Sequence, residues 1–249
     1  MRRRFAFALF AALLLPSSGS AESLISTLSD DAVEITSSFT GESIVVFGAV
    51  RGAPEGDPGY EVAIVVQGPP QDVVARRKER LFGIWANRTS REFQDVPSYY
   101  VMHLSPNFSG AGNLTKLREY RLGVASLPFV QSASDRTSEL FARAVIDLKT
   151  ARALYVERRS AVEFLAPNVF RTTFFLPSEI PTGEYRVSVY LFRGDTFLAG
   201  QTQGLRIEKR GFSERIARTA DRRPLLYGLS CVALAGFTGW FAGVVFRRP

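Results

Sequence analysis

Short apolar runs alternate with polar turns over most of the chain, which is the pattern of a β protein. Residues 44–50 and 60–66 are apolar at nearly every position, as expected of strands that are covered on both faces. The connector 51–59 holds three Gly and two Pro, and 67–70 reads Gln-Gly-Pro-Pro. We therefore predict two buried strands, with a hairpin-like return at each of these connectors.

Later strands are predicted over 73–78, 81–86, 99–104, 169–176, 185–192 and 197–207, with Gly194-Asp195 as the turn between the last two. The stretch before Tyr185 is similar to a corner of immunoglobulin-like sandwiches, in which a tyrosine hydroxyl bonds back to the backbone. An ordinary half-buried strand tyrosine fits the same stretch. The number of strands predicts a mainly β fold, an immunoglobulin-like β-sandwich.

A helical insertion is predicted between about residues 106 and 160. Over 138–157 apolar residues recur at steps of three and four, while Arg143, Asp147, Lys149 and Arg152 fall on other faces. This spacing predicts an amphipathic helix packed on the sandwich. A shorter helix is expected over 114–122, with Asn113 as its N-cap and Gly123 as its end.

Both ends of the chain carry membrane-related signals. Residues 1–21 combine three arginines, an apolar stretch and small residues before Ala21, which predicts a cleaved signal peptide, with an uncleaved second anchor as the alternative. Residues 225–246 are almost wholly apolar and would form a helix of about 33 Å, enough to cross a bilayer. We predict an exported domain over 22–208, a transmembrane helix over 225–246 and a cytoplasmic tail over 247–249, which together place the bulk of the protein on the exported side of a membrane.

Charge is concentrated at the ends. The span 22–208 holds 20 of the 31 Lys and Arg and 22 of the 24 acids, so the domain carries about −2, and nucleic-acid binding loses its support. Segment 209–224 is basic and reads either as an interfacial helix on anionic headgroups or as a solvated linker. Its charge opposes the usual positive-inside bias, but long exported domains cross membranes largely regardless of charge.

Reactive residues are scarce. Cys231 is the only cysteine and lies in the apolar C-terminal run, and His103 is the only histidine, so no cofactor, metal site or disulfide is predicted. Ser105 would share a strand face with His103, yet no nucleophile-elbow motif and no orienting carboxylate accompany the pair. The chain is therefore interpreted as no enzyme.

One surface patch is a candidate for binding a partner or an anion. It consists of a basic strand end and nearby aromatic and polar residues: Arg76, Arg77, Lys78, Arg80, Trp85, Asn87, Tyr99 and Tyr100. The competing interpretation is an edge strand whose charges discourage edge-to-edge aggregation.

A second candidate surface lies in the C-terminal apolar run. Ala235, Gly239 and Gly243 recur every four residues, which is the small-residue spacing that lets helices approach closely in a membrane. This stripe predicts packing with another copy or with an integral membrane protein. Glycine is also simply common in spanning helices.

Several blocks together resemble a known family. They are Gly83-Ile-Trp-Ala-Asn87, Val96-Pro-Ser-Tyr-Tyr100, residues 148–155, Pro181-Thr-Gly-Glu-Tyr185 and the tail from Leu225 to Arg248. The chain resembles the uncharacterised alphaproteobacterial transmembrane family over nearly its whole mature length. The resemblance implies a bacterial source, and with it a location in the bacterial inner membrane with the bulk of the chain in the periplasm. It also implies genes beside exporters of the sulfite type, and it implies no catalytic residue.

Three classes of function follow. The leading hypothesis is a non-enzymatic accessory subunit of a membrane assembly, which the family's genomic company relates to a small-anion exporter. The alternatives are a periplasmic recognition or assembly module for envelope proteins and, more distantly, a membrane-anchored hydrolase. The expected partners are the lipid bilayer and an integral membrane protein or a second copy.

Overall fold

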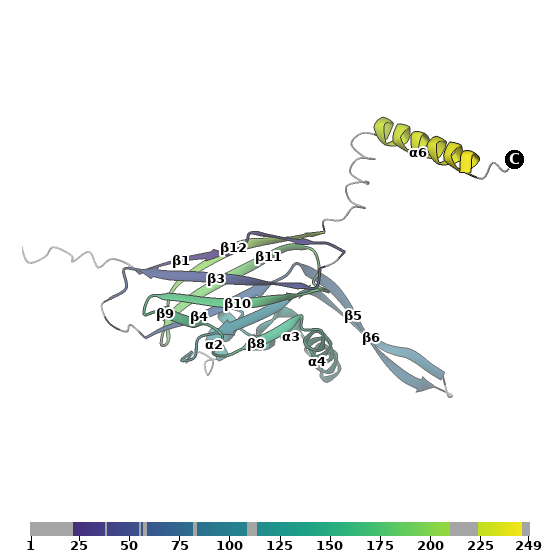
Figure 1. The fold of residues 1–249 in the computed structure, drawn as a ribbon. Coiled ribbons are helices and arrows are strands. Elements are labelled where there is room, and N and C mark those ends of the chain that lie inside the picture. The colour runs from purple at the N-terminus through teal and green to yellow at the C-terminus, as the bar shows by residue number, and fades with distance from the viewer. Residues whose placement is uncertain are drawn as a thin grey trace, which may run out of the picture.

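A β-sandwich, a helical layer and a long two-stranded arm make up the computed structural model (Figure 1). It describes residues 22–37, 39–54, 56, 59–81, 84–108, 114–209 and 224–245. The predicted signal peptide 1–21 and the predicted tail 247–249 therefore lie outside the described residues, as does the basic segment 209–224 except for its two end residues.

The first sheet has four strands in the order β1-β3-β10-β9. Its strands are β1 (Ser23–Leu28), β3 (Gly41–Arg51), β9 (Glu163–Ala166) and β10 (Val169–Pro177). Alternation of buried and exposed residues is regular in β10, where Phe170, Thr172 and Phe174 face inward and Arg171 and Thr173 face outward. This sheet therefore covers the core with one face only.

The second sheet has six strands in the order β2-β12-β11-β4-β7-β8. Its strands are β2 (Ala32–Ile35), β4 (Tyr60–Gln67), β7 (Tyr100–Leu104), β8 (Tyr155–Arg158), β11 (Gly183–Arg193) and β12 (Thr196–Lys209). Every residue of β4 except Gln67 is buried, and so is all of β7. These two strands need an apolar layer on each of their faces.

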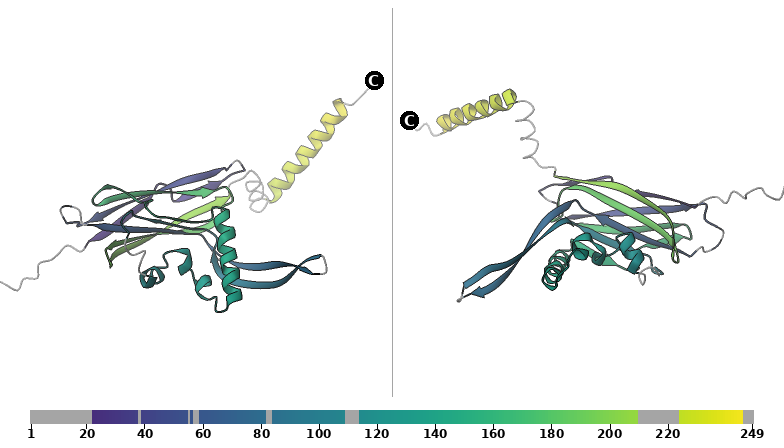
Figure 2. Two further views of the ribbon diagram at one scale, coloured as in Figure 1. Left: turned by 90° about the horizontal axis from the view of Figure 1, so that it is seen from below. Right: turned by 180° about the vertical axis from the view of Figure 1, so that it is seen from behind.

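The first sheet covers one face of the second, and the helices cover the other (Figures 1 and 2). The helical layer contains α2 (Leu114–Glu119), the short helix η3 (Val124–Ser126), α3 (Pro128–Gln131) and α4 (Arg136–Ala151). The Asp135 side chain caps α4 by accepting a hydrogen bond from Ser138 N at 2.8 Å. The insertion predicted between about residues 106 and 160 thus contains helices in its described part, and these helices cover β4 and β7.

Helix α4 ends earlier than the predicted residue 157. Ala153 adopts a left-handed conformation with φ 54°, and the amides of Ala153 and Leu154 donate to the carbonyls of Thr150 and Lys149, both at 2.9 Å. These two bonds close the helix in a Schellman arrangement that usually uses glycine. The chain then continues as β8, which pairs in parallel with β7. The amphipathic spacing continued past the end of the helix and concealed this strand.

The two predicted hairpin-like returns after residues 50 and 66 are wrong. Strand β3 pairs with β1 and β10 in the first sheet, whereas β4 pairs with β11 and β7 in the second. Because β4 is buried on both faces it takes a central position with two other neighbours, so the connector 51–59 passes between sheets. The predicted turn at Gly194-Asp195 is confirmed, since β11 and β12 form an antiparallel hairpin.

Tyr185 makes the expected corner contact. It is fully buried at the start of β11, and its hydroxyl donates to the carbonyl oxygen of Pro181, four residues upstream, at 2.5 Å. The mainly β class is confirmed, and the immunoglobulin-like assignment stays a prediction.

The third sheet is an arm of two strands, β5 (Pro70–Leu81) and β6 (Ile84–Pro97), which pair only with each other among the described strands. The arm projects away from the sandwich in both views of Figure 2. The sequence pattern located part of each strand but not their length, because residues 87–97 lack apolar alternation.

Residues Pro224–Val245 form helix α6, which overlaps all but the last residue of the stretch 225–246 for which a helix was predicted. In the part of the chain that the structure describes, no helix combines the length and the apolarity that crossing a membrane requires. The predicted spanning helix over 225–246 is therefore not supported by the described residues.

Gly48 provides a test of the sandwich packing. A Cβ at this position of β3 would lie 2.1 Å from Cζ of Phe170, whose ring is fully buried on the neighbouring strand and cannot move aside cheaply. We predict that Gly48→Ala lowers the free energy of unfolding by about 1–3 kcal/mol, measured by urea denaturation.

The matched control is Gly204→Ala on β12, where the new Cβ would meet no atom within 4 Å. It should change stability by no more than about 0.5 kcal/mol. Equal stability of the two variants would contradict the packing of Phe170 over Gly48.

Candidate functional site

The β5–β6 arm carries most of the predicted patch. Arg76, Arg77, Lys78 and Arg80 lie on β5 and are exposed, and exposed Asn87 on β6 is the direct cross-strand partner of Lys78. Trp85 pairs through its backbone with Arg80, but its side chain lies outside the described residues. The structure thus places six of the eight patch residues along one ribbon.

Ion pairing neutralises only part of this charge. Arg77 contacts Glu79 at 2.5 Å, and Arg88 on β6 approaches the same carboxylate at 3.9 Å. Exposed pairs of this kind contribute little to stability because water screens them. Among the described residues, Arg76, Lys78 and Arg80 make no ion pair, so the arm keeps a cationic surface.

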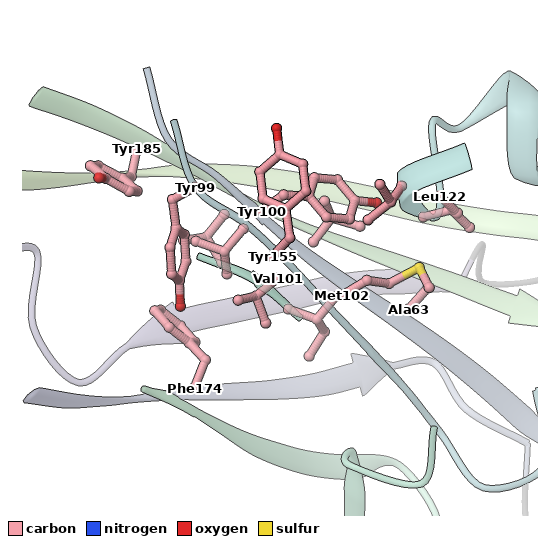
Figure 3. Close-up of a cluster of buried hydrophobic side chains, with 14 of the residues drawn as sticks. Ala63, Tyr99, Tyr100, Val101, Met102, Leu122, Tyr155, Phe174 and Tyr185 are labelled. Carbon is pink, nitrogen blue, oxygen red and sulfur yellow. The ribbon is translucent and has the colours of Figure 1, made fainter. Parts of the chain in front are cut away.

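Tyr99 and Tyr100 do not belong to this surface, and their assignment to the patch is wrong. Both are fully buried (Figure 3). The Tyr99 hydroxyl donates to Phe175 O at 2.7 Å across the sandwich, and the Tyr100 hydroxyl accepts from Gly123 N at 2.7 Å under the helical layer. Burial raises the pKa of both hydroxyls. Their sequence neighbourhood looked exposed because it follows the charged arm, but the chain enters the core immediately after it.

A groove of about 560 Å³ lies between β5 and α4, beside the root of the arm, and was not predicted from the sequence. One face of α4, from Thr137 to Lys149, and the C-cap residue Arg152 line it opposite residues 73–77 of β5. Leu140 and Leu148 are more than half exposed there, and Val74 is half exposed. The signal was present in the amphipathic spacing of α4, because residues four apart share one face. What the spacing could not show is that this face is only partly covered.

Lys149 was expected on a polar face of the helix, but it is buried and lines this groove. Its ammonium donates to Ser98 O at 3.2 Å and lies 5.4 Å from the centre of the Tyr155 ring. Burial, followed by the nearby charge of Arg152, lowers the pKa of Lys149 to about 8. Among the described residues no carboxylate pairs with it, which is uncommon for a buried cation.

His103 and Ser105 take separate structural roles. His103 is buried, with Nδ1 2.8 Å from Thr172 Oγ1 on the opposite sheet, and that hydroxyl donates to Ala161 O. Nδ1 of His103 therefore carries the proton and donates it to Thr172. Ser105 Oγ accepts from Val62 N at 3.0 Å. The two side chains do not form a nucleophile and base pair.

The small-residue stripe of α6 lies open. Ala235 is exposed, and a Cβ on Gly239 would meet no atom within 4 Å. The surroundings of Gly243 lie outside the described residues. Whether this stripe packs against another helix stays a prediction. In the described ranges, no three His, Cys, Asp or Glu side chains are grouped as a metal site would require.

The buried histidine predicts a pH dependence of stability. Burial, and then the charge of Arg158, lower the pKa of His103 to about 4 from the usual 6.5. Between these values the unfolded chain binds a proton that the folded chain excludes, so the free energy of unfolding falls as the pH falls from 6.5 to 4. Titration of His103 is expected to lower the free energy of unfolding by about 3 kcal/mol in total, and this loss is nearly complete at pH 4.

His103→Asn keeps a donor for Thr172 and removes the titration. We expect urea denaturation of this variant to show a shallower loss of stability than wild type over pH 6.5–4. Identical slopes for the two proteins would show that His103 does not exclude the proton.

Comparison with solved structures finds a match to the crystal structure of the sporulation control protein Spo0M from Bacillus subtilis, at 11% identity and a TM-score of 0.28. That match covers 81% of this chain and 55% of the Spo0M chain, so this chain spans about half of the length of Spo0M. Comparison with curated proteins finds no match. A family described as "Putative transmembrane protein (Alph_Pro_TM)" matches residues 23–248, and the chain therefore belongs to that family.

Proposed function

We propose that the protein is a membrane-attached interaction subunit that contacts an integral membrane protein through its β5–β6 arm. The proposal rests on one observation, the arm itself. A ribbon of two strands that pairs with no third strand is only marginally stable in water and is a liability for a free protein. Retaining two strands of 12 and 14 residues in this form is expected where the ribbon has a partner to engage.

The root of the arm is held firmly while its outer part is left open. Phe93 of β6 packs edge to face on Phe129 of α3, with ring centroids 5.9 Å apart, and Arg91 Nε donates to Ser138 Oγ of α4 at 3.3 Å. Beyond these contacts lie Lys78 and Arg80 on β5. The root of the arm is fixed, and in its outer part β5 and β6 pair with each other but with no third described strand. Such an element can present its two edges to a partner without first being ordered, which lowers the entropic cost of binding.

The charge of the arm indicates the chemistry of the partner. Exposed cations on a protruding element favour an acidic surface, because complementary potentials accelerate encounter and fix orientation. The specific partner that we propose is a polytopic exporter of small anions with an acidic face on the exported side. This choice rests on the genomic company expected for the family, and we propose no catalytic residue.

Helix α6 supports attachment to a membrane. Its large apolar side chains are exposed along the helix, among them Leu225, Leu229, Val232, Leu234, Phe237, Trp240 and Phe241. A continuous apolar surface of this kind is not stable in water and marks contact with lipid or with another protein. The family description is consistent with this role, and we propose an exported sandwich over 22–208 held at the inner membrane.

Attachment through α6 predicts the behaviour of a truncated chain. The full-length protein should sediment with membranes, whereas a chain ending at Lys209 should be recovered from the soluble exported fraction with its sandwich folded. Immunoblots of fractionated cells, with thermal unfolding of the released domain, measure both. A truncated chain that is folded and still sediments would contradict attachment through α6.

The arm predicts a charge-dependent association. Lys78→Glu with Arg80→Glu should reduce photocrosslinking of the full chain to an integral membrane protein by about tenfold or more, because like charges then face the acidic partner. Both residues are exposed and make no ion pair in the described ranges, so folding should be unaffected.

The matched control is Arg51→Glu with Arg186→Glu, which reverses two exposed arginines on the sandwich. This variant should crosslink as wild type does. If crosslinking falls equally in the arm and sandwich variants, the effect is one of net charge and not of the arm. If crosslinking falls in neither variant, the arm is not the contact surface.

A further inference from the structure

We propose that the groove between β5 and α4 binds a single-chain amphiphile with an anionic headgroup, a fatty-acid carboxylate, with the headgroup on Lys149 and Arg152 and the acyl chain along the face of α4. This site is independent of the partner proposed for the outer arm.

Both walls of the groove contribute apolar side chains. Leu140, Ala144 and Leu148 of α4 lie opposite Val73, Val74 and Ala75 of β5. The volume of about 560 Å³ is within the range of sites for small apolar ligands, roughly 300–1,000 Å³. Leu140 and Leu148 remain 55% and 64% exposed, so apolar surface is available for an occupant to bury.

Two hydrogen bonds fix the direction of the groove. Ser138, at the start of α4, accepts from Arg91, whose cross-strand partner is Ala75 within the arm. Lys149, near the end of α4, donates to Ser98, where the chain enters the sandwich. The helix thus runs from the arm toward the sandwich, and Lys149 of its last turn and the C-cap residue Arg152 line the sandwich end of the groove together with Leu154 and Pro181. Figure 2 shows α4 beside the root of the arm in both views.

Charge selects the headgroup. Four cationic side chains line the groove, Arg76, Arg77, Lys149 and Arg152, against one exposed carboxylate, Glu179. Arg77 is engaged by Glu79, but Lys149 and Arg152 make no ion pair among the described residues. A buried ammonium with one carbonyl partner has further donors to offer, and an anion would compensate its desolvation. A pKa near 8 leaves most of the lysine protonated at pH 7.

The occupant is a single acyl chain because of the shape of the site. The groove follows one face of one helix opposite one strand, so its apolar side chains form a single track, and a two-chain phospholipid would leave one chain in water. A peptide helix would bring terminal N–H and C=O groups that need hydrogen-bond partners, and the apolar side chains of the groove offer none.

Photocrosslinking tests this assignment on the full chain in membranes. The probe is a palmitate analogue that carries a diazirine in its acyl chain. We expect labelled peptides from α4 and from residues 73–77 of β5, competition by palmitate, and no competition by hexadecyltrimethylammonium, which has the same chain and the opposite charge.

Two variants separate headgroup from chain. Lys149→Met keeps the side-chain length and should reduce labelling about tenfold, because a charge-assisted bond is lost. Ala144→Trp fills the groove and should abolish labelling. Arg143→Met, which removes an exposed cation of α4 that does not line the groove, should label as wild type does, and thermal unfolding of each variant monitors folding.

Several outcomes would overturn the proposal. They are labelling elsewhere than α4 and β5, equal competition by the cationic amphiphile, and unchanged labelling in a folded Ala144→Trp variant. None of these outcomes bears on the charge-reversed arm, so failure here and failure of the proposed partner contact are distinguishable.

Discussion

Burial of β4 on both faces is the constraint on which the rest of the architecture depends. Its side chains from Tyr60 to Val66 are buried in both directions, so the six-stranded sheet requires an apolar layer on each side. The four-stranded sheet supplies one layer, and the segment between β7 and β8 supplies the other. Because this segment also has to return the chain from β7 to β8 in parallel, it is long and helical.

The position of α4 is a consequence of the same requirement. Phe141, Ala142 and Val145 turn toward the core, and this orientation brings Lys149 under the helix and against Tyr155. The neighbouring face, with Leu140 and Leu148, then has only the root of the arm to cover it. The groove thus lies between α4, which covers the six-stranded sheet, and the β5–β6 arm, which forms a separate sheet.

Much of this fold could be predicted from the sequence where burial follows a simple period. Strand β10 alternates strictly, α4 recurs at three and four residues, and Gly194-Asp195 gives the last hairpin its turn. Pairing could not be predicted, because apolar runs such as β3 and β4 show that a strand is buried but not which strand lies beside it. The arm was underestimated because its outer residues are stabilised by cross-strand hydrogen bonds and not by a core.

The candidate site was predicted in part. Charges on β5 identify an exposed ribbon, since a run of arginines and lysines cannot be buried without partners. Tyr99 and Tyr100 show the limit of this reasoning, because an aromatic residue next to a charged segment fits a binding surface and a core equally well. Lys149 shows the opposite error, since only the packing of Ser98 and Tyr155 around α4 reveals that this cation is buried.

The pairing of the first strands with the last ones has a consequence for how the chain folds. Ser26 of β1 is bonded to Gln201 and Gln203 of β12, some 175 residues away, and β2 lies in parallel beside the end of β12. Contacts this distant in sequence form slowly, because closing the long loop costs chain entropy before the contact can stabilise the structure. Strand β1 can pair early with the nearby β3, but β2 keeps an unpaired edge until nearly the whole domain has emerged, and an exposed strand edge of this kind favours aggregation during folding.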